Sequence, residues 1–545
     1  MRVRSRAYNP PVLDAHALPN DVESLKRLLL EREETVQARD VELREKQRQI
    51  EHLKLQLAKL RRARFGQSSE ALKGAGQLPL ILEELKATVA EAVHGMQDTP
   101  EENGSEPKGQ PVRRKKLPEH FDRIEQVIEP KECVCPDCGG ALKMLGKPDE
   151  SEVMEVKTVT FTVTRRIRPK KRCTRCFTIV QAPAPSRPIP KSFAGASVLA
   201  LILTWKYGFH LPLYRQCQIF AHAGLKISRT TLMQWVGASS ALLDPLVAAL
   251  GKYVLAAPHL NADDTPVKVL APGRGKVKRG HLWTYVRDGR GWKSRDPPAV
   301  WYQYAPSWHG KYPQQHLARY RGKLQVDAYA GYEPLFISSR PDEPARIVEI
   351  ACASHMRRKF FDLYVALKSP LAKEALDRFR QLYRIEKQIR GRSPEERFTA
   401  RQAHAVPLLK DFHDWMIQTT GHVEKKTELA AAFHYALNNW DALVRYTQDG
   451  RLAIDNNTAE RSLRGVGVGR KNYLFFGSDT GGERAANIYS LIESCRRNQI
   501  DPQCYLQYVL ERIADHPINR VEELLPWNIA GQLNQPSQVA EALAA

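Results

Sequence analysis

A chain of 545 residues, with 42% hydrophobic and 26% charged residues, is long enough for several globular domains and too apolar to be disordered throughout. Its net charge of +22 is spread over many segments, which favours association with nucleic acid over an anionic membrane surface. No run approaches ~18 consecutive apolar residues and the N-terminus lacks the apolar core of a signal peptide, so we expect a cytoplasmic protein without membrane contact.

After a tail at residues 1–20, a heptad repeat over residues 21–64 predicts a coiled coil. One core position is apolar throughout and is occupied by Val22, Leu29, Val36, Leu43, Ile50 and Leu57. The companion position is apolar at its ends and basic in its middle, at Leu25, Arg32, Arg39, Lys46, Leu53 and Leu60. This pattern predicts a homo-oligomer or pairing with another subunit; the alternative is a single helix packed on the body of the protein. Residues 65–115, polar and rich in Pro and Gly in their later half, form a linker.

Two CxxC pairs lie in residues 116–190. Cys135 and Cys138 form the first pair and Cys173 and Cys176 the second, and the segment between them alternates in polarity as strands do. Two such turns joined by a β-hairpin predict a zinc ribbon in which four thiolates bind one Zn²⁺. A redox pair would explain one CxxC but not two, and Cys133 remains a possible competitor of Cys135.

Residues 191–250 read as helical and contain helix-turn-helix spacing. We expect a short helix over residues 216–223, ended by Gly224, and a second helix capped by Ser228. Polar side chains that could read DNA follow the cap, at Arg229, Thr230 and Gln234. A plain helical hairpin without a DNA contact is the alternative.

From residue 255 the pattern changes to strands and predicts an α/β catalytic core. Three strands over residues 259–307 form a meander, a short helix precedes a fourth strand that ends at Asp327, and a fifth leads into a helix starting near residue 355. Residues 371–450 look like a helical insertion into this first part of the core, residues 255–370. The core returns over residues 451–494 with a helix bearing Glu460, and residues 495–545 form a C-terminal helical domain. This order of elements fits a ribonuclease-H-like fold.

Three carboxylates, Asp263, Asp327 and Glu460, occupy strand ends and a helix start where distant parts of a chain can converge. Each has a simpler interpretation: Asp263 as a polar strand residue, Asp327 as a turn residue, and Glu460 as half of a capping box with Asn457. Together they predict a site for Mg²⁺ or Mn²⁺, because two ions held by such oxygens drive in-line phosphoryl transfer. In a basic chain this combination indicates a nuclease or a DNA-joining enzyme.

Basic residues adjoin these positions and predict contacts with the DNA backbone. They are Arg357 and Arg358, which follow His355, and then Arg461, Arg464, Arg470 and Lys471. His355 is expected to join the backbone contacts. The glycine-rich stretch over residues 465–471 lacks the spacing of a nucleotide-binding P-loop, and we expect a flexible basic turn there.

At this point the chain resembles transposases of the bacterial insertion-sequence-66 family, which belong to the DDE class. The matching segments include LRRARFGQSSE, both CxxC pairs, ADDTPVKVL, LQVDAYAGY, ACASHMRRKFFDL and AIDNNTAERSLRGVGVGRKNYLFFGS, from about residue 20 to about residue 515. The resemblance implies a leucine zipper, a zinc-binding domain, an interrupted ribonuclease-H-like core and the triad Asp263, Asp327 and Glu460. The family usually has Asp-Glu-Thr at the first position, whereas this chain has Asp263-Asp264-Thr265, so Asp264 is an alternative first ligand.

The resemblance implies a nucleoid-associated DNA transposase that binds double-stranded transposon ends, cleaves them and joins them to target DNA with two Mg²⁺ or Mn²⁺ ions. Accessory proteins from the same element are possible partners. Two other functions fit the sequence: a catalytically inactive DNA-binding regulator and a nuclease that cuts without joining.

Overall fold

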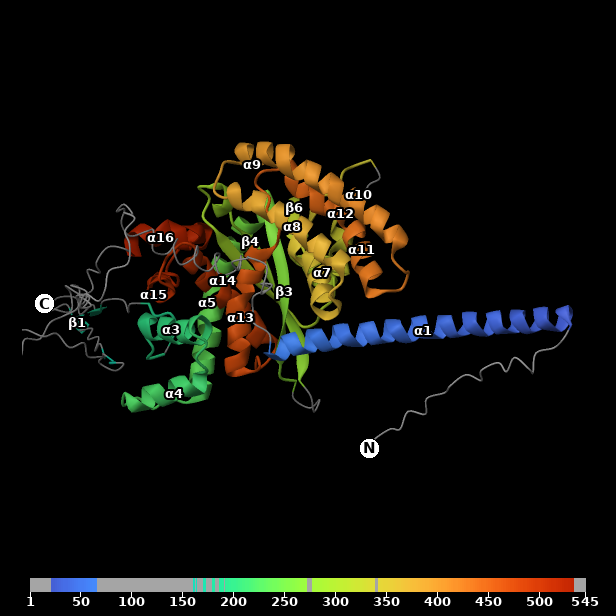
Figure 1. Ribbon diagram of the computed structural model, residues 1–545. Helices are drawn as coiled ribbons and strands as arrows, with labels where there is room; N and C mark the ends of the chain where they lie inside the picture. The colour runs from blue at the N-terminus through green and yellow to red at the C-terminus, as the bar shows by residue number, and fades with distance from the viewer. Residues whose placement is uncertain are drawn as a thin grey trace, which may run out of the picture. The chain divides into compact units, whose positions relative to one another are not determined.

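The fold is mostly helical and is built around one mixed five-stranded sheet, as a computed structural model shows (Figure 1). The structure describes residues 21–65, 160–161, 163, 170–172, 179–181, 186–190, 192–271, 277–338 and 342–533. The chain divides into two compact units: residues 1–70, 183–216 and 228–545 form the first, and residues 71–182 and 217–227 form the second. Within the second unit, β1 (Lys170–Arg172) and β2 (Ile179–Gln181) pair as an antiparallel hairpin.

The sheet of the first unit has the strand order β5-β4-β3-β6-β7. Its strands are β3 (His259–Val269), β4 (Lys278–Arg287), β5 (Ala299–Ala305), β6 (Gly322–Val326) and β7 (Ile347–Ala351). β3, β4 and β5 form an antiparallel meander, whereas β6 and β7 continue from β3 in parallel. β3 is the central strand, with the antiparallel β4 on one side and the parallel β6 on the other.

A first group of helices precedes the sheet in the sequence or connects its strands. They are α1 (Val22–Phe65), α3 (Ala196–Leu203), the π-helix η2 (Thr204–Gly208), α4 (Leu213–His222), α5 (Arg229–Leu255), the 3-10 helix η3 (Arg290–Trp292), α6 (Lys311–His316) and the 3-10 helix η4 (Ala330–Leu335). α5 is long and apolar enough to cross a membrane, but half of its apolar window is buried inside the fold, as expected of a core helix.

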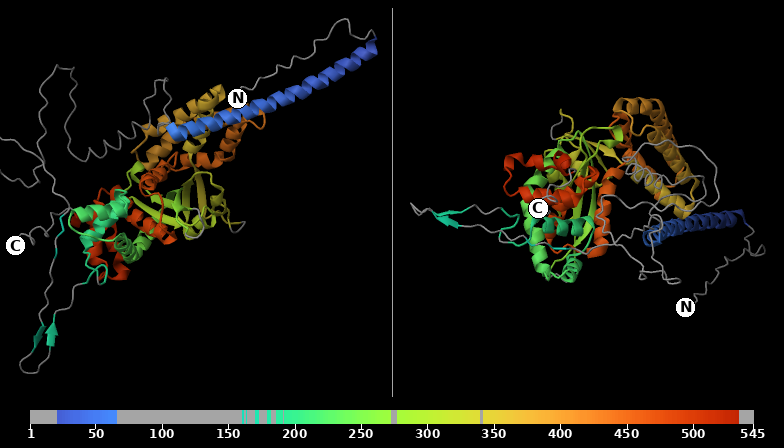
Figure 2. Two further views of the ribbon diagram at one scale, coloured as in Figure 1. Left: turned by 90° about the horizontal axis from the view of Figure 1, so that it is seen from below. Right: turned by 90° about the vertical axis from the view of Figure 1, so that its left-hand side faces the viewer.

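The remaining helices follow β7. Those up to the return of the chain are α7 (Ala353–Leu367), α8 (Pro370–Gln388), α9 (Pro394–Ala400), the π-helix η5 (Arg401–Ala405), α10 (Val406–His422), α11 (Glu428–Asn438), α12 (Trp440–Val444) and the 3-10 helix η6 (Arg445–Gln448). The last ones are α13 (Asn457–Tyr473), α14 (Asp479–Arg497), α15 (Pro502–Arg512), the 3-10 helix η7 (Ile518–Leu524) and α16 (Pro526–Leu533). The helices α8 to α11 gather on one side of the sheet and α14 to α16 on the other (Figure 2).

Both edges of the sheet are covered, which protects their backbone groups from pairing with another chain. On the β5 edge, the Ser490 and Ser494 hydroxyls of α14 accept the amide hydrogens of Tyr302 and Val300 at 2.8 and 3.0 Å. On the β7 edge, the Arg445 guanidinium donates to the carbonyl of Glu349 at 2.9 Å. A helix that follows the insertion therefore covers the β5 edge, and the end of the insertion itself covers the β7 edge.

A buried arginine holds the segment that returns from the insertion to the core. Arg401 is fully buried, and its guanidinium donates to both carboxylate oxygens of Glu386 on α8, at 2.8 and 2.7 Å. The same group also donates to the carbonyls of Tyr446, Asp449 and Leu452. These contacts fix the chain directly before α13 begins.

The strand and helix pattern expected for the core is confirmed, from the meander through the strand that ends before Asp327 to the helix that carries Glu460. The Ser228 cap is confirmed too, since its hydroxyl accepts the amide hydrogen of Thr231 at 3.0 Å. The short helix before it starts three residues earlier than expected, at Leu213.

The flexible turn expected over residues 465–471 is wrong, because α13 continues through it to Tyr473. Val466 and Gly469 are buried in this helix. A Cβ atom at Gly469 would lie 2.3 Å from the Tyr473 hydroxyl and 3.0 Å from the Tyr489 hydroxyl. This glycine permits close packing of α13 against α14 instead of providing flexibility.

We predict that Arg401→Ala lowers the free energy of unfolding by about 3–5 kcal/mol. Glu386 would stay buried with only the Arg397 guanidinium, 3.7 Å away, beside it. The carbonyls of Tyr446 and Asp449 would lose this donor. Urea denaturation followed by circular dichroism measures this change. Lys373→Ala, on the same helix as Glu386, removes an exposed ion pair with Asp377 and should cost less than about 0.5 kcal/mol. Equal losses of unfolding free energy in the two variants would contradict the role of Arg401 in holding the segment that returns to the core.

Candidate active site

The three predicted catalytic carboxylates come from three different elements. Asp263 lies in the middle of β3, Asp327 directly follows β6, and Glu460 lies in the first turn of α13. β3 and β6 are parallel neighbours, and α13 packs on β3. The fold therefore brings together residues that are 197 positions apart in the sequence, from 263 to 460.

A buried network of amide side chains ties these three elements together. Asn261 on β3 donates to Gln325 on β6 and to Asn456, the residue before α13, both at 3.0 Å. Asn456 donates to the carbonyl of Ala262 at 2.7 Å, and Gln325 donates to that of Ala453 at 2.8 Å. Asp263 lies two residues after Asn261, and Asp327 two residues after Gln325, which is one repeat of a strand. Glu460 lies four residues after Asn456, which is about one turn of a helix.

The electrostatics of Asp263 show that negative charges have been assembled here. Burial raises the pKa of Asp263 well above its usual value, and the charges of Asp327, Glu460 and Asp264 raise it further. Burial also raises the pKa of Asp327, although the nearby His355 opposes this shift. Repulsion between buried carboxylates is typical of sites where a cation binds or where catalysis needs a carboxyl group with a shifted pKa.

His355 lies among the carboxylates, in the first turn of α7. Its Nδ1 is 3.9 Å from Oε1 of Glu460, and one ligand atom each from Cys352, His355 and Glu460 lie within 4.8 Å of one another. Cys352 is buried, which raises the pKa of its thiol, and its sulfur accepts the amide hydrogen of Asn456 at 3.2 Å. Sequence reasoning assigned His355 to the DNA backbone and missed Cys352. The signal available for this pair was the three-residue spacing of Cys352 and His355 at the junction between β7 and α7.

The simpler interpretation of Glu460 as part of a capping box is wrong. Asn456, not Asn457, is the N-cap residue of α13, and its side chain makes no capping hydrogen bond. Asn457 donates to Asp455 at 2.9 Å instead. Oε1 of Glu460 is buried and has no hydrogen-bond partner among the described residues.

Asp264 is held in a different environment from Asp263. Nδ1 of His281 and Nε1 of Trp308 lie 2.5 and 3.1 Å from its two carboxylate oxygens. Neighbouring residues of a strand point to opposite faces of the sheet. Asp263 therefore shares the face of Asn261, on which Asn456 and α13 lie, and Asp264 points to the opposite face.

The donor set fits a hard divalent cation. Carboxylate oxygens are the ligands that Mg²⁺ and Mn²⁺ prefer, and a buried Glu460 oxygen without a partner is free to bind one. A cation among Asp263, Asp327 and Glu460 would also neutralise the repulsion that raises the pKa of Asp263. His355 is close enough to take part as a nitrogen ligand.

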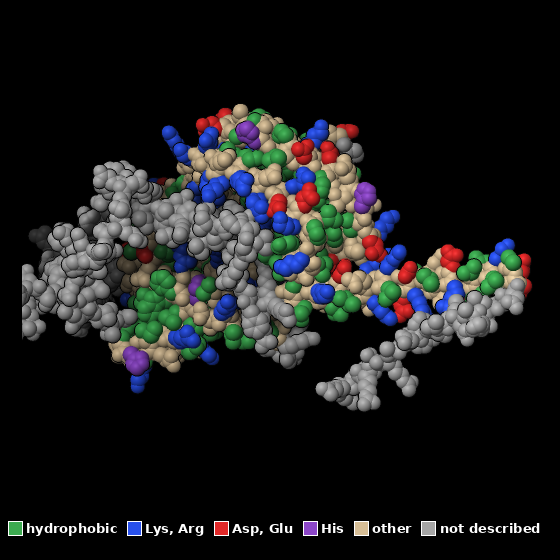
Figure 3. Space-filling view, viewed as in Figure 1, with side chains coloured by type: hydrophobic (Ala, Val, Ile, Leu, Met, Phe, Trp, Pro, Cys, Tyr) green, Lys and Arg blue, Asp and Glu red, His purple; other side chains and the backbone are tan. Residues whose placement is uncertain are grey.

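The residues predicted to contact DNA differ in how accessible they are. The exposed ones are Arg229, Thr230, Gln234, Arg461, Arg464 and Lys471. Arg357 and Arg358 are half-buried, and the Arg357 guanidinium lies 5.6 Å from the centre of the Phe361 ring. The Arg470 guanidinium donates to the carbonyl of Pro266, so it holds α13 against β3. Where the structure describes it, the face seen in Figure 3 has Lys and Arg side chains dispersed over several elements.

The zinc ligands expected at Cys135, Cys138, Cys173 and Cys176 lie outside the described residues. The β1–β2 hairpin flanks the second pair, since β1 ends at Arg172 and β2 starts at Ile179. The hairpin expected to join the two pairs falls mainly outside the described residues, and β1–β2 is a different hairpin.

Comparison with known proteins identifies the family. A model described as the transposase IS66 family matches residues 191–484, and one described as the IS66 C-terminal element matches residues 490–527. The chain belongs to the IS66 transposase family. A zinc-finger binding domain of transposase IS66 matches residues 132–176, and a model described as transposase C of IS166 homeodomain matches residues 52–125. Membership of this family implies a DNA-binding protein of transposition with a zinc-finger domain.

Relatives from one bacterium support this assignment. The chain is 39% identical to the uncharacterized protein y4hP of Sinorhizobium fredii (strain NBRC 101917 / NGR234) over 87% of its own length and 88% of the relative. It is 34% identical to the uncharacterized protein y4jD of the same strain, over 94% and 97% of the two chains. The family architecture therefore extends over nearly the whole chain.

The raised pKa of Asp263 predicts how stability depends on pH when divalent cations are absent. An acid whose pKa is raised in the folded state binds more protons when folded, so the free energy of unfolding should fall as the pH rises from about 4 through the raised pKa. Asp263→Asn should remove this part of the fall and should be more stable than wild type at pH 7. Urea titrations of both proteins in EDTA measure the free energy of unfolding at each pH. A wild-type protein more stable than Asp263→Asn at pH 7 would contradict the repulsion among the carboxylates.

Proposed function

We propose that this chain is an active DNA transposase whose Asp263, Asp327 and Glu460 hold the divalent cations for cleavage and strand transfer at the ends of its element. The observation that supports this most strongly is the convergence of three carboxylates from β3, β6 and α13 in a chain of net charge +22. A purely structural role does not require buried like charges to be kept side by side.

The arrangement of the sheet supports the proposal. A meander of three strands followed by two parallel strands, with the first strand central, is the arrangement of a ribonuclease-H-like core. The helices α8 to α12 would then form the family insertion, between the elements that carry Asp327 and Glu460.

When bound, Mg²⁺ or Mn²⁺ would activate the attacking water or 3′-hydroxyl and stabilise the leaving oxygen. The residues of the chain hold and orient the DNA: Arg461 and Arg464 are exposed on α13, within one turn of Glu460, where they would bind the phosphates next to the cleaved bond. Glu460, four residues after the hydrogen-bonded N-cap Asn456, is kept in place by the amide network.

Recognition of the element ends would depend on the zinc ribbon and the start of α5. Cys135, Cys138, Cys173 and Cys176 would bind one Zn²⁺. Arg229, Thr230 and Gln234 are exposed after the Ser228 cap, while Leu232 and Trp235 are buried, so one side of the helix start is open to DNA.

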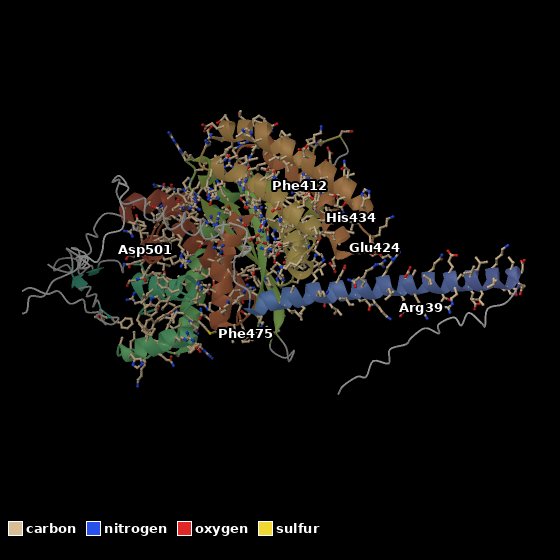
Figure 4. The ribbon with its side chains drawn as sticks, in the orientation of Figure 1. Arg39, Phe412, Glu424, His434, Phe475 and Asp501 are labelled. Atoms are coloured by element: carbon tan, nitrogen blue, oxygen red, sulfur yellow. The ribbon has the colours of Figure 1, made fainter. Side chains whose placement is uncertain are left out.

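The exposed heptad of α1 supports self-association. All six residues of the apolar position are exposed, by 46% or more of their surface: Val22, Leu29, Val36, Leu43, Ile50 and Leu57. α1 meets the insertion with other residues: Arg48 forms an ion pair with Glu424, which Figure 4 labels, and Nδ1 of His52 lies 2.5 Å from Oε1 of Glu428. Leu55 of α1 is buried. In the heptad these positions lie away from the apolar seam, so docking leaves it free for a second copy.

We predict that Asp327→Asn and Glu460→Gln each reduce strand cleavage and joining by at least about 100-fold, because each removes an ionised oxygen ligand. The assay uses labelled DNA with the ends of the encoding element and Mg²⁺ or Mn²⁺, and binding is measured by gel shift. Both variants should bind DNA as wild type does.

Glu511→Gln, on α15, is the matched control and should keep full activity. Cleavage without joined products in the wild type would indicate a nuclease. Binding without chemistry in the wild type would indicate an inactive regulator, and either result would contradict the proposal.

We predict that Leu29→Lys combined with Leu43→Lys converts the oligomer to a monomer, because two charges would be buried in the seam. Light scattering coupled to size-exclusion chromatography measures the mass. Glu34→Lys combined with Gln37→Lys changes exposed α1 residues on the side of the helix away from the seam and should leave the mass unchanged. A wild-type monomer at micromolar concentration would refute self-association through α1.

A further inference from the structure

A half-exposed indole lies beside the candidate active site. Trp308, in the loop after β5, has 53% of its surface exposed although it is large and apolar. Its Nε1 donates to Asp264 at 3.1 Å, and Asp264 directly follows Asp263. The indole is therefore hydrogen-bonded to β3 one residue after Asp263, on the opposite face of the strand.

Neighbouring aromatic rings keep the indole in one orientation. The Tyr329 ring stacks on it with centroids 4.3 Å apart and an interplanar angle of 17°, and the Tyr329 hydroxyl donates to the Trp308 carbonyl at 3.1 Å. The His281 ring is nearly parallel as well, at 5.8 Å and 11°. Trp308, Tyr329 and His281 are called the aromatic ledge below.

The backbone that carries the ledge is held equally firmly. A Cβ atom at Gly310 would lie 2.8 Å from Cα of Gly331, so the loops that follow Trp308 and Tyr329 touch each other directly. Gln314 on α6 donates to the carbonyl of Gly331 at 3.2 Å. Because the two loops hold each other, the ledge is formed before any ligand arrives.

Such a surface suits a planar, apolar ligand that arrives together with phosphates. A nucleobase is such a ligand, and stacking on aromatic side chains is how proteins bind bases that have left the duplex. A paired base inside a duplex hides both of its faces, so the ledge can bind only an unpaired one. We propose that the aromatic ledge binds one unstacked base of the DNA next to the cleaved phosphate; this rests on the proposed function.

The position of the aromatic ledge relative to the carboxylates also suits the binding of a base. Asp264 accepts the Trp308 and His281 hydrogen bonds on the face of β3 opposite to Asp263, and Tyr329 of the ledge lies two residues after Asp327. A base on the ledge would therefore place its own phosphate beside the end of β6, where Asp327 lies. Binding of an extruded base would thus fix the nucleotide at the cleavage point, independently of sequence recognition elsewhere.

The test compares the binding of full-length wild-type and Trp308→Ala protein to end DNA by fluorescence anisotropy, with Ca²⁺ and without cleavage. Each of the three nucleotides on either side of the cleavage point is replaced in turn by an abasic one. Trp308→Ala should weaken binding to intact DNA about 10-fold, and the loss should shrink to below about 2-fold when the abasic nucleotide is the one that stacks. An equal loss on intact DNA and on all six abasic substrates would overturn the proposal.

Trp308→Phe separates stacking from the hydrogen bond to Asp264, because it keeps an aromatic face and lacks the N–H. It should bind intact DNA within about 3-fold of wild type; a loss as large as that of Trp308→Ala would assign the effect to Asp264 and refute the ledge. Phe398→Ala removes an exposed aromatic ring on α9 and should bind normally. The binding assay needs no chemistry, so a chain that fails to cleave DNA would refute the proposed function while leaving this result interpretable.

Discussion

The candidate site depends on the amide network of Asn261, Gln325 and Asn456. These three side chains are almost completely buried, and in such a place every unpaired amide group is costly. Their hydrogen bonds can form only when β3, β6 and the start of α13 take one relative position. The network thereby fixes the geometry of three elements whose carboxylates repel one another, and it uses neutral groups that do not add to the charge.

The insertion contributes to the same constraint from the other direction. Between α7 and α13 the chain makes a long helical excursion, and its return must end at a defined point beside β7. Arg401 and Glu386 fix that return through the carbonyls of the returning segment, and the Ala353 amide donates to the Ile454 carbonyl at 3.1 Å. At the far end of α13, the Phe476 amide donates to the Lys268 carbonyl at 2.8 Å. α13 is therefore attached to β3 at both of its ends.

The sequence predicted the elements of the core well because strand alternation and helix starts are local properties. Asp327 at the end of a strand and Glu460 near a helix start needed only the pattern of neighbouring residues. The amide network could not be predicted in this way, because Asn261, Gln325 and Asn456 interact across 195 residues and no periodicity marks them. Glycines 465, 467 and 469 misled for a related reason: a glycine that permits helix packing looks the same as one that bends a turn.

The two adjacent aspartates of β3 illustrate what strand geometry adds to a sequence. Resemblance favoured Asp263 as the first ligand and left Asp264 one position away. In an extended strand that single step reverses the direction of the side chain. Asp264 is already bonded to His281 and Trp308, whereas the carboxylate of Asp263 feels the charges of Asp327 and Glu460. The charge of Asp264 also raises the pKa of Asp327, but both of its oxygens already have partners and its side chain points to the opposite face of the strand. The proposal therefore places Asp263 in the triad and Asp264 under the aromatic ledge.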